Sequence, residues 1–173
     1  MPACSDSHVI VKPFEAISTR EFYEIAKLRT DVFFVEQKVD ETELDYRDLE
    51  PETRHYWIAA EDGSVLAYLR TLWNEEPEHR AAHVVIGRVV TRADARGRGL
   101  ASRLLAAAIA DNPGRDIALH AQEYAKGLYA KAGFEAFGEV YLEAGIRHIG
   151  MYRAAERASD LETGGVASAR VGV

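Results

Sequence analysis

Apolar residues recur along this chain with the spacing of helices in some segments and of strands in others. Residues 18–36 and 100–111 carry apolar side chains three and four positions apart, which predicts a helix in each, and a shorter helix is expected at 125–132. Alternating or continuous apolar runs predict strands at 8–14, 54–61, 64–73, 83–91, 117–122, 134–143 and 146–153. The order β-α-β-β-β-α-β-α-β-β predicts a mixed α/β or α+β domain without an internal repeat.

Cap and turn residues separate these segments. Ser18-Thr19-Arg20-Glu21 is a capping box and marks the start of the first helix. Asp62-Gly63 is a strong signal for a tight hairpin between two strands. Asn112-Pro113-Gly114 ends the second long helix, and Gly133 closes the short one. The last two strands are expected to form a hairpin across Ala144-Gly145.

The length and composition are typical of one globular domain. A chain of 173 residues can bury a sizeable core, and 47% apolar with 28% charged residues is ordinary for such a protein. We expect a single domain at residues 1–153. Residues 154–173 change to alanine, glycine and serine with few large apolar side chains, which predicts a flexible tail.

Charge and cysteine content exclude several classes of protein. A net charge of −7 argues against general nucleic-acid binding, which needs a basic face. The single cysteine, Cys4, excludes an intrachain disulfide and offers no metal-ligand cluster. No apolar run is long enough to span a membrane, and the first residues lack the pattern of a signal peptide. We therefore expect a cytoplasmic location.

Acidic side chains concentrate at residues 36–52, where eight carboxylates stand against Lys38 and Arg47. Two interpretations stay open: a solvated loop surface, or a field that attracts a cationic substrate. Arg29 and Arg88 lie inside apolar runs and need a carboxylate partner if they are buried. An ion pair with Glu36 would meet that need.

A glycine-rich turn opens the helix at 100–111. The sequence Arg96-Gly97-Arg98-Gly99-Leu100-Ala101 follows a strand rich in β-branched residues, and Arg103 lies one turn further on. The unpaired backbone N–H groups of such a turn and the helix dipole together favour an anion. The turn therefore predicts a site for the phosphates of a cofactor.

Two motifs in this order resemble the GNAT family of acetyl-CoA-dependent N-acetyltransferases. Arg96, Gly99 and Ala101 match the family's pattern of Arg or Gln, two residues, Gly, one residue, and Gly or Ala. About 25 residues further on, a second run resembles the family's Asn-x-x-Ala-x-x-Leu-Tyr-x-Lys-x-Gly-Phe. It is made by Gln122, Ala125, Leu128-Tyr129, Lys131 and Gly133-Phe134. The resemblance covers residues 8–153.

A narrower resemblance is to the ElaA-like branch of this family. It rests on residues 28–37, on Arg54-His55, on Val85-Ile86-Gly87-Arg88-Val89 and on His148-Ile149-Gly150-Met151. Two features depart from the family's pattern. Gln122 stands where many members have Asn, and the link between the strand and the glycine turn lacks the common proline.

The resemblance implies the GNAT fold, a central mixed and mostly antiparallel sheet of about seven strands flanked by helices. A gap is expected between the strand at 83–91 and its neighbour at 117–122. The co-substrate implied is acetyl-CoA, without a metal, and the acceptor is a primary amine on a small molecule or a peptide; a homodimer is compatible with this family. The residues expected to bind the cofactor are Val89, Val90, Thr91, Arg96, Gly97, Arg98, Gly99, Leu100, Ala101, Ser102 and Gln122.

Attack of an amine on a thioester needs a base, a donor to the carbonyl oxygen, and an acid for the departing thiolate. By the resemblance, the acid is the phenol of Tyr129, and a backbone N–H near Val90 polarises the carbonyl. Glu36, His55, Glu143 and His148 are candidates for the base, because most of them fall in the branch-specific motifs. We predict Glu36 and His148 as the catalytic members of that set.

Other classes fit the sequence less well. A dinucleotide-dependent oxidoreductase would need a glycine where Ser102 stands and an acidic residue where Gln122 ends its strand. A nucleotide-hydrolysing P-loop would need Gly-Lys-Ser or Gly-Lys-Thr after the turn. The alternative that stays open is a non-catalytic protein that binds and senses acyl-CoA.

Overall fold

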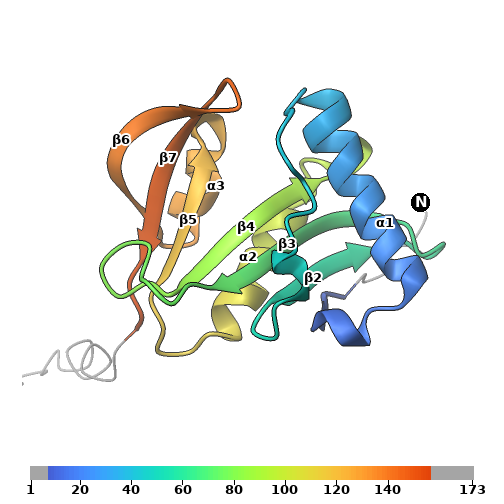
Figure 1. Cartoon of the computed structure of the whole chain (residues 1–173), viewed down its shortest axis with the longest axis horizontal. Coiled ribbons are helices and arrows are strands. Elements are labelled where there is room, and N and C mark those ends of the chain that lie inside the picture. The colour runs from blue at the N-terminus through green and yellow to red at the C-terminus, as the bar shows by residue number, and fades with distance from the viewer. Residues whose placement is uncertain (1–7, 157–173) are drawn as a thin grey trace, which may run out of the picture.

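The computed structural model describes residues 8–156 (Figure 1). Seven strands form one sheet in the order β1-β2-β3-β4-β5-β7-β6. All neighbouring strands are antiparallel except β4 and β5, which are parallel. The strands are β1 (Ile10–Lys12), β2 (Arg54–Ala59), β3 (Val65–Trp73), β4 (Val84–Thr91), β5 (Ile117–Gln122), β6 (Glu135–Glu143) and β7 (Ile146–Arg153), and the helices are α1 (Thr19–Arg29), α2 (Leu100–Ala110) and α3 (Lys126–Lys131). This order confirms the predicted fold class. The predicted flexible tail lies, from residue 157 on, outside the described residues.

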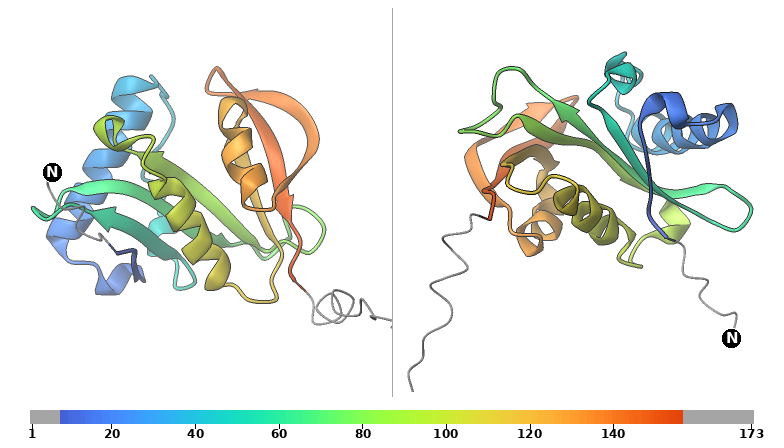
Figure 2. Two further views of the ribbon diagram at one scale, coloured as in Figure 1. Left: turned by 180° about the vertical axis from the view of Figure 1, so that it is seen from behind. Right: turned by 90° about the horizontal axis from the view of Figure 1, so that it is seen from below.

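Helices cover both faces of the sheet (Figure 2). On one face, Ile25 and Leu28 of α1 pack in a cluster with Trp57 of β2. On the other face, α2 and α3 contribute Leu104 and Tyr129 to the larger cluster of the core. Because side chains alternate between the faces of a strand, a sheet covered on both sides needs apolar residues at successive positions. This explains the nearly continuous apolar run of β3.

The sheet divides between β4 and β5. Residues 84–86 pair with 117–119, and beyond them the two strands diverge (Figure 1). A bulge in β4 lies where they separate: the register with β3 shifts between Tyr68 and Arg70, and Arg88 has a φ of +55°. A bulge bends a strand and increases its twist. The gap expected beside the strand at 117–122 is therefore present.

Two elements differ from the sequence prediction. The long first helix is divided, because α1 is followed by a π-helical segment, Thr30–Glu36, in which three of seven residues are β-branched. Its last turn is closed by the N–H of Gln37, which donates to the carbonyl of Val32 at 2.9 Å. The first strand is also shorter than predicted. β1 ends at Lys12 because Pro13, which follows, has no N–H to donate to a sheet.

Candidate active site

A cleft of about 810 Å³ opens where β4 and β5 diverge. Its lining comes from these strands, from the π-helical segment and the acidic loop after it, from α2 and α3, and from the β6–β7 hairpin. A concave site of this size suits a cofactor-sized ligand. The predicted site residues that line it are Val89, Val90, Thr91, Arg96, Ala101, Gln122, Tyr129 and His148. The predicted residues outside that lining are Glu36, Gly97, Arg98, Gly99, Leu100 and Ser102.

The glycine turn has the geometry of an anion site. Gly97 and Gly99 have φ values of +76° and +74°, and Gly99 is the N-cap of the 11-residue helix α2. Within residues 8–156, the backbone N–H groups of residues 97–102 have no acceptor, and the first donor of α2 is the N–H of Arg103. A Cβ built on either glycine would meet nothing within 4 Å. The turn therefore combines open space with a row of unpaired donors.

Arg96 is held by an ion pair in this structure. Its Nη2 lies 2.8 Å from Oε2 of Glu36, and its Nε donates to the carbonyl of Thr91 at 3.2 Å. The hydrogen bond from Arg96 holds the pKa of Glu36 below its ordinary value. Glu36 is an exposed, paired carboxylate outside the cleft lining, which is a poor setting for a base. Arg98 donates to the carbonyl of Asp94 at 3.3 Å.

Tyr129 is a buried phenol at the cleft. It lies on α3 with 6% of its surface exposed, and its ring packs edge-on against Phe134 at 6.3 Å between centroids. Within the described residues, its hydroxyl has no hydrogen-bond partner. Burial, with a smaller contribution from Tyr124, raises the pKa of Tyr129 above the ordinary value of a phenol. The group therefore stays protonated at neutral pH, as a proton donor must.

His148 also lies at the cleft, with one ring nitrogen engaged. Its Nδ1 lies 2.9 Å from the carbonyl oxygen of Ile146, and the ring stacks on Tyr141 with centroids 5.9 Å apart. A carbonyl oxygen only accepts, so Nδ1 carries the proton of the neutral ring. The lone pair is then on Nε2, which makes no hydrogen bond to another residue within 8–156.

The other candidate bases have different surroundings. His55 is fully buried between β2 and the acidic loop, with Nδ1 at 2.7 Å from the hydroxyl of Tyr68 and Nε2 at 3.0 Å from the carbonyl of Asp48. Burial lowers the pKa of His55, so the neutral ring is a structural part of the core. Glu143 is exposed at the end of β6 and lines the cleft.

Gln122 makes a reciprocal amide pair across the cleft. Its Nε2 donates to Oε1 of Gln37 at 2.9 Å, and Nε2 of Gln37 donates back at 3.3 Å. The pair joins the end of β5 to the end of the π-helical segment. Gln37 was not predicted as a site residue, although it is the last residue of the first branch-specific motif.

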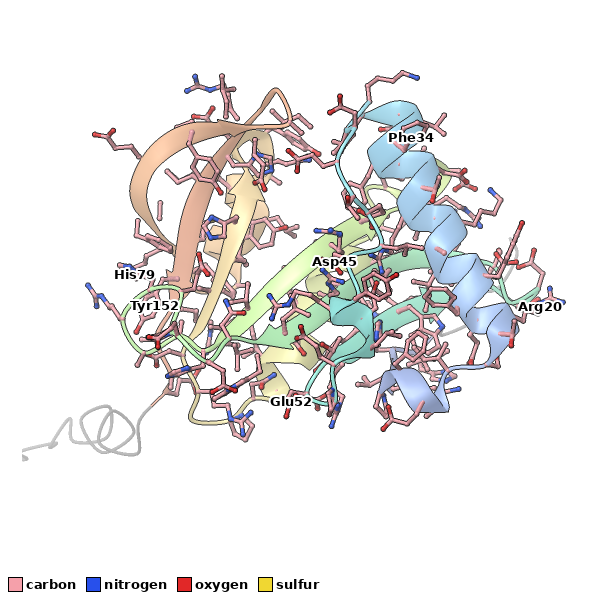
Figure 3. The ribbon with its side chains drawn as sticks, viewed as in Figure 1. Arg20, Phe34, Asp45, Glu52, His79 and Tyr152 are labelled. Carbon is pink, nitrogen blue, oxygen red and sulfur yellow. The ribbon has the colours of Figure 1, made fainter. Side chains whose placement is uncertain are left out.

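Arginines of α1 and of the sheet hold the acidic loop, residues 37–53. Asp48 is 3% exposed, and its Oδ1 accepts from Arg29 at 2.9 Å and from Arg70 at 2.8 Å. Asp45 accepts two hydrogen bonds from Arg70, and Figure 3 shows it in the loop that crosses β3 and β4. Burial alone would raise the pKa of Asp45, but Arg70 and then Arg88 lower it to about 2. Glu43, Asp45 and Asp48 of this loop thus neutralise arginines of α1, β3 and β4.

This network corrects two expectations from the sequence. Arg29 pairs with Glu43 and Asp48, and not with Glu36. The acidic segment is also more than a solvated surface or a steering field, since part of its charge is used inside the protein. Sequence reasoning missed Arg70, whose signal is an arginine inside the apolar run of β3.

Some features are not found in the described part of the chain. Across residues 8–156, three or more metal-ligating side chains do not come together in any one place. Over the same residues, the helices are too short or too polar to cross a bilayer.

Comparison with known proteins identifies the family. Residues 19–154 match the acetyltransferase (GNAT) domain. A UPF0039 protein of Mycobacterium tuberculosis is 42% identical over 139 residues, which cover 79% of this chain and 86% of that protein. The crystal structures of an acyl-CoA N-acyltransferase from Pseudomonas aeruginosa and of Escherichia coli ElaA are 40% and 30% identical, both with a TM-score of 0.75. Each covers 84% of this chain, and the matches span 99% and 98% of those structures. The divided sheet, the glycine turn and these relatives together show that the chain belongs to the GNAT acetyltransferase family, in its ElaA-like branch.

Proposed function

We propose that this protein transfers the acetyl group of acetyl-CoA to a primary amine. The observation that carries the proposal is that one cleft brings Tyr129 together with the arginine that precedes the glycine turn. The unpaired donors of residues 97–102 fit the pyrophosphate, because an anion there would meet N–H groups and open space. Acetyl-CoA would supply the activated thioester. The acceptor is a small polyamine-like or aminoglycoside-like amine, or an amine of a protein.

Residues of the chain supply the acid, the donor to the carbonyl oxygen and the base. The Tyr129 hydroxyl donates its proton to the departing sulfur, and a backbone N–H near Val90 donates to the carbonyl oxygen. Nε2 of His148 takes a proton from the attacking nitrogen. Glu36 is not retained as a base, because its carboxylate is exposed and paired with Arg96.

The test is release of the CoA thiol with a panel of amines. The panel holds an alkylamine, a polyamine, an aminoglycoside and a lysine peptide, each with acetyl-CoA in excess. We expect turnover with at least one of them above the rate of thioester hydrolysis. Tight binding of acetyl-CoA in calorimetry, together with no turnover of any amine, would favour the acyl-CoA sensor instead.

Gly99→Val is expected to weaken acetyl-CoA binding at least tenfold. A β-branched residue at a φ of +74° is strained by roughly 1–3 kcal/mol, and its side chain would occupy the space assigned to the pyrophosphate. Gly63→Val is the matched control, because Gly63 has a φ of +84° in the β2–β3 turn with the same open surroundings. Calorimetry should show a raised Kd only for Gly99→Val. An equal Kd for acetyl-CoA in both variants would show that the turn has only a structural role.

A further inference from the structure

Three polar side chains form a chain of hydrogen bonds that the proposed reaction does not yet use. The hydroxyl of Tyr141 lies 2.6 Å from Nδ1 of His120, and Nε2 of His120 lies 2.7 Å from Oε1 of Glu78. They come from β6, from β5 and from the loop between β3 and β4. Segments far apart in the sequence therefore meet in one carboxylate–imidazole–phenol row.

The direction of these hydrogen bonds follows from the acceptor at one end. The Glu78 carboxylate only accepts, so Nε2 of His120 carries a proton. In the neutral ring, Nδ1 then accepts, and the Tyr141 hydroxyl is the donor. The carboxylate is itself held in place, because its other oxygen accepts from Nδ2 of Asn74 at 3.2 Å. Its backbone N–H also donates to the carbonyl of Ala82, at 2.9 Å.

The row joins the active-site cleft to a separate surface pocket. Tyr141 and His120 line the cleft. Glu78 lies outside that lining and instead lines an open pocket of about 670 Å³ on the outer surface. Four further carboxylates share that pocket: Glu50, Glu52, Glu75 and Glu76. A proton that enters the row at Tyr141 therefore has a route out of the cleft toward an acidic, solvated surface.

The proposed reaction needs such a route. An alkylamine arrives at neutral pH as an ammonium ion, and its nitrogen loses two protons before it is an amide. One of the two protons replaces the proton that Tyr129 donates to the CoA thiolate. His148 can take this proton from the nitrogen and pass it to Tyr129, which restores the phenol. The other is released to solvent as the net product of the reaction. Tyr129 and His148 together therefore account for one proton only.

We propose that Tyr141, His120 and Glu78 form a proton relay that exports the first proton of the acceptor ammonium. The Tyr141 oxygen accepts that proton while its own proton passes to Nδ1 of His120. The resulting imidazolium is stabilised by Glu78 and then releases its Nε2 proton to water. No electrons are exchanged, and Tyr141 and Glu78 end as they began. The His120 ring is left protonated at Nδ1, and it returns to its Nε2–H form by exchanging protons with water before the next turnover. Tyr141 is the catalytic residue, because it contacts the substrate nitrogen. His120 and Glu78 are positioning residues that act through Tyr141.

The surroundings of Tyr141 favour transfer through the group over a standing phenolate. Burial, and then the carboxylates of Glu143 and Glu78, raise the pKa of the Tyr141 hydroxyl. The ring is held by its stack on His148 of β7, at 5.9 Å, and meets His120 edge-on at 5.8 Å. Besides the relay's own members, the titratable groups that face Tyr141 are thus Glu143 and His148.

The test rests on the proposed function and uses the full chain with acetyl-CoA and the best alkylamine of the panel. Tyr141→Phe keeps the ring stack and removes only the hydroxyl. At pH 7 its kcat/KM for the amine should fall at least tenfold, with an unchanged KM for acetyl-CoA. As pH rises toward about 10, more of the amine arrives neutral and the deficit should shrink. Glu78→Gln keeps a hydrogen-bond acceptor but removes the charge, and should show a smaller deficit with the same pH trend.

Three comparisons make the outcome decisive. Tyr23→Phe removes an exposed hydroxyl on α1 and should match the parent chain. His148→Gln should show a deficit that persists at high pH, because the second proton is lost after attack. A Tyr141→Phe variant with the parent rate at pH 7, or with a deficit that does not change with pH, would overturn the relay. Absence of turnover in the parent chain with every amine would instead overturn the proposed function, and the relay with it.

Discussion

Tyr129→Phe is expected to lower kcat by about 10²–10⁴, which corresponds to about 3–5 kcal/mol of transition-state stabilisation. The substitution keeps the buried ring and its edge-on contact with Phe134, and it removes only the hydroxyl. Because that hydroxyl has no partner within the described residues, its loss leaves no buried polar group behind. Stability and acetyl-CoA affinity should therefore stay nearly unchanged. Steady-state kinetics, calorimetry and a thermal melt check the three quantities.

The raised pKa of Tyr129 sharpens this test. Since burial keeps the phenol protonated beyond its ordinary range, Tyr129 should not produce an alkaline limb in the pH–rate profile below about pH 10. The profile of the variant should keep its shape while its height falls. Tyr46→Phe, at a tyrosine that is 83% exposed, is the control and should keep the parent kcat. A parent-like kcat in Tyr129→Phe, where chemistry limits the rate, would make Tyr129 a packing residue.

Asp48→Ala is expected to destabilise the fold by about 3–5 kcal/mol. The side chain is buried and bridges Arg29 and Arg70, which are 0% and 2% exposed. Its removal leaves two buried guanidinium groups short of an acceptor and releases the acidic loop from the sheet. Denaturant unfolding at pH 7 measures the change. Asp31→Ala breaks an exposed pair with Lys27 and should leave the unfolding free energy nearly unchanged; an equal effect of both variants would contradict the argument.

The same network predicts a loss of stability in acid. Burial alone would raise the pKa of Asp48, but Arg29 and then Arg70 outweigh it and hold that pKa below its ordinary value. A depressed pKa in the folded state contributes stability above the unfolded pKa, and that contribution is lost as pH falls through the folded value. Because the pKa of Asp45 in the folded state is about 2, its contribution to stability should be lost between about pH 4 and about pH 2. The difference in unfolding free energy between the parent chain and Asp48→Ala should be largest above pH 4 and should decrease as the pH falls below 4.

Local signals were sufficient to predict most elements of the fold. The capping box at Ser18, the Asp62-Gly63 turn and the Ala144-Gly145 turn each specify backbone geometry within a few residues, and the structure contains the predicted element at each. The π-helical end of the first helix was not predicted. Its apolar spacing is also compatible with an ordinary α-helix, and packing against the sheet selects between the two.

The glycine turn proposed to bind the cofactor was more predictable from sequence than the side-chain groups across the cleft. The turn at residues 97–102 is a contiguous motif whose function depends on its own backbone. The Gln37–Gln122 pair and the proposed relay from Glu78 to Tyr141 are instead built from groups that are far apart in the chain. None of these residues carries a local signal that names its partner.

The amino-acid sequence by itself determined the order of elements, the glycine turn and the identity of the buried phenol, because each depends on neighbouring residues or on a contiguous motif. Only the tertiary structure decided which carboxylate neutralises Arg29, that Arg96 is paired with Glu36, and that β7 lies between β5 and β6. These choices depend on long-range pairing, in which several carboxylates or strands compete for one partner. The competition is resolved by the desolvation of charges and by packing, which act only once the chain has folded.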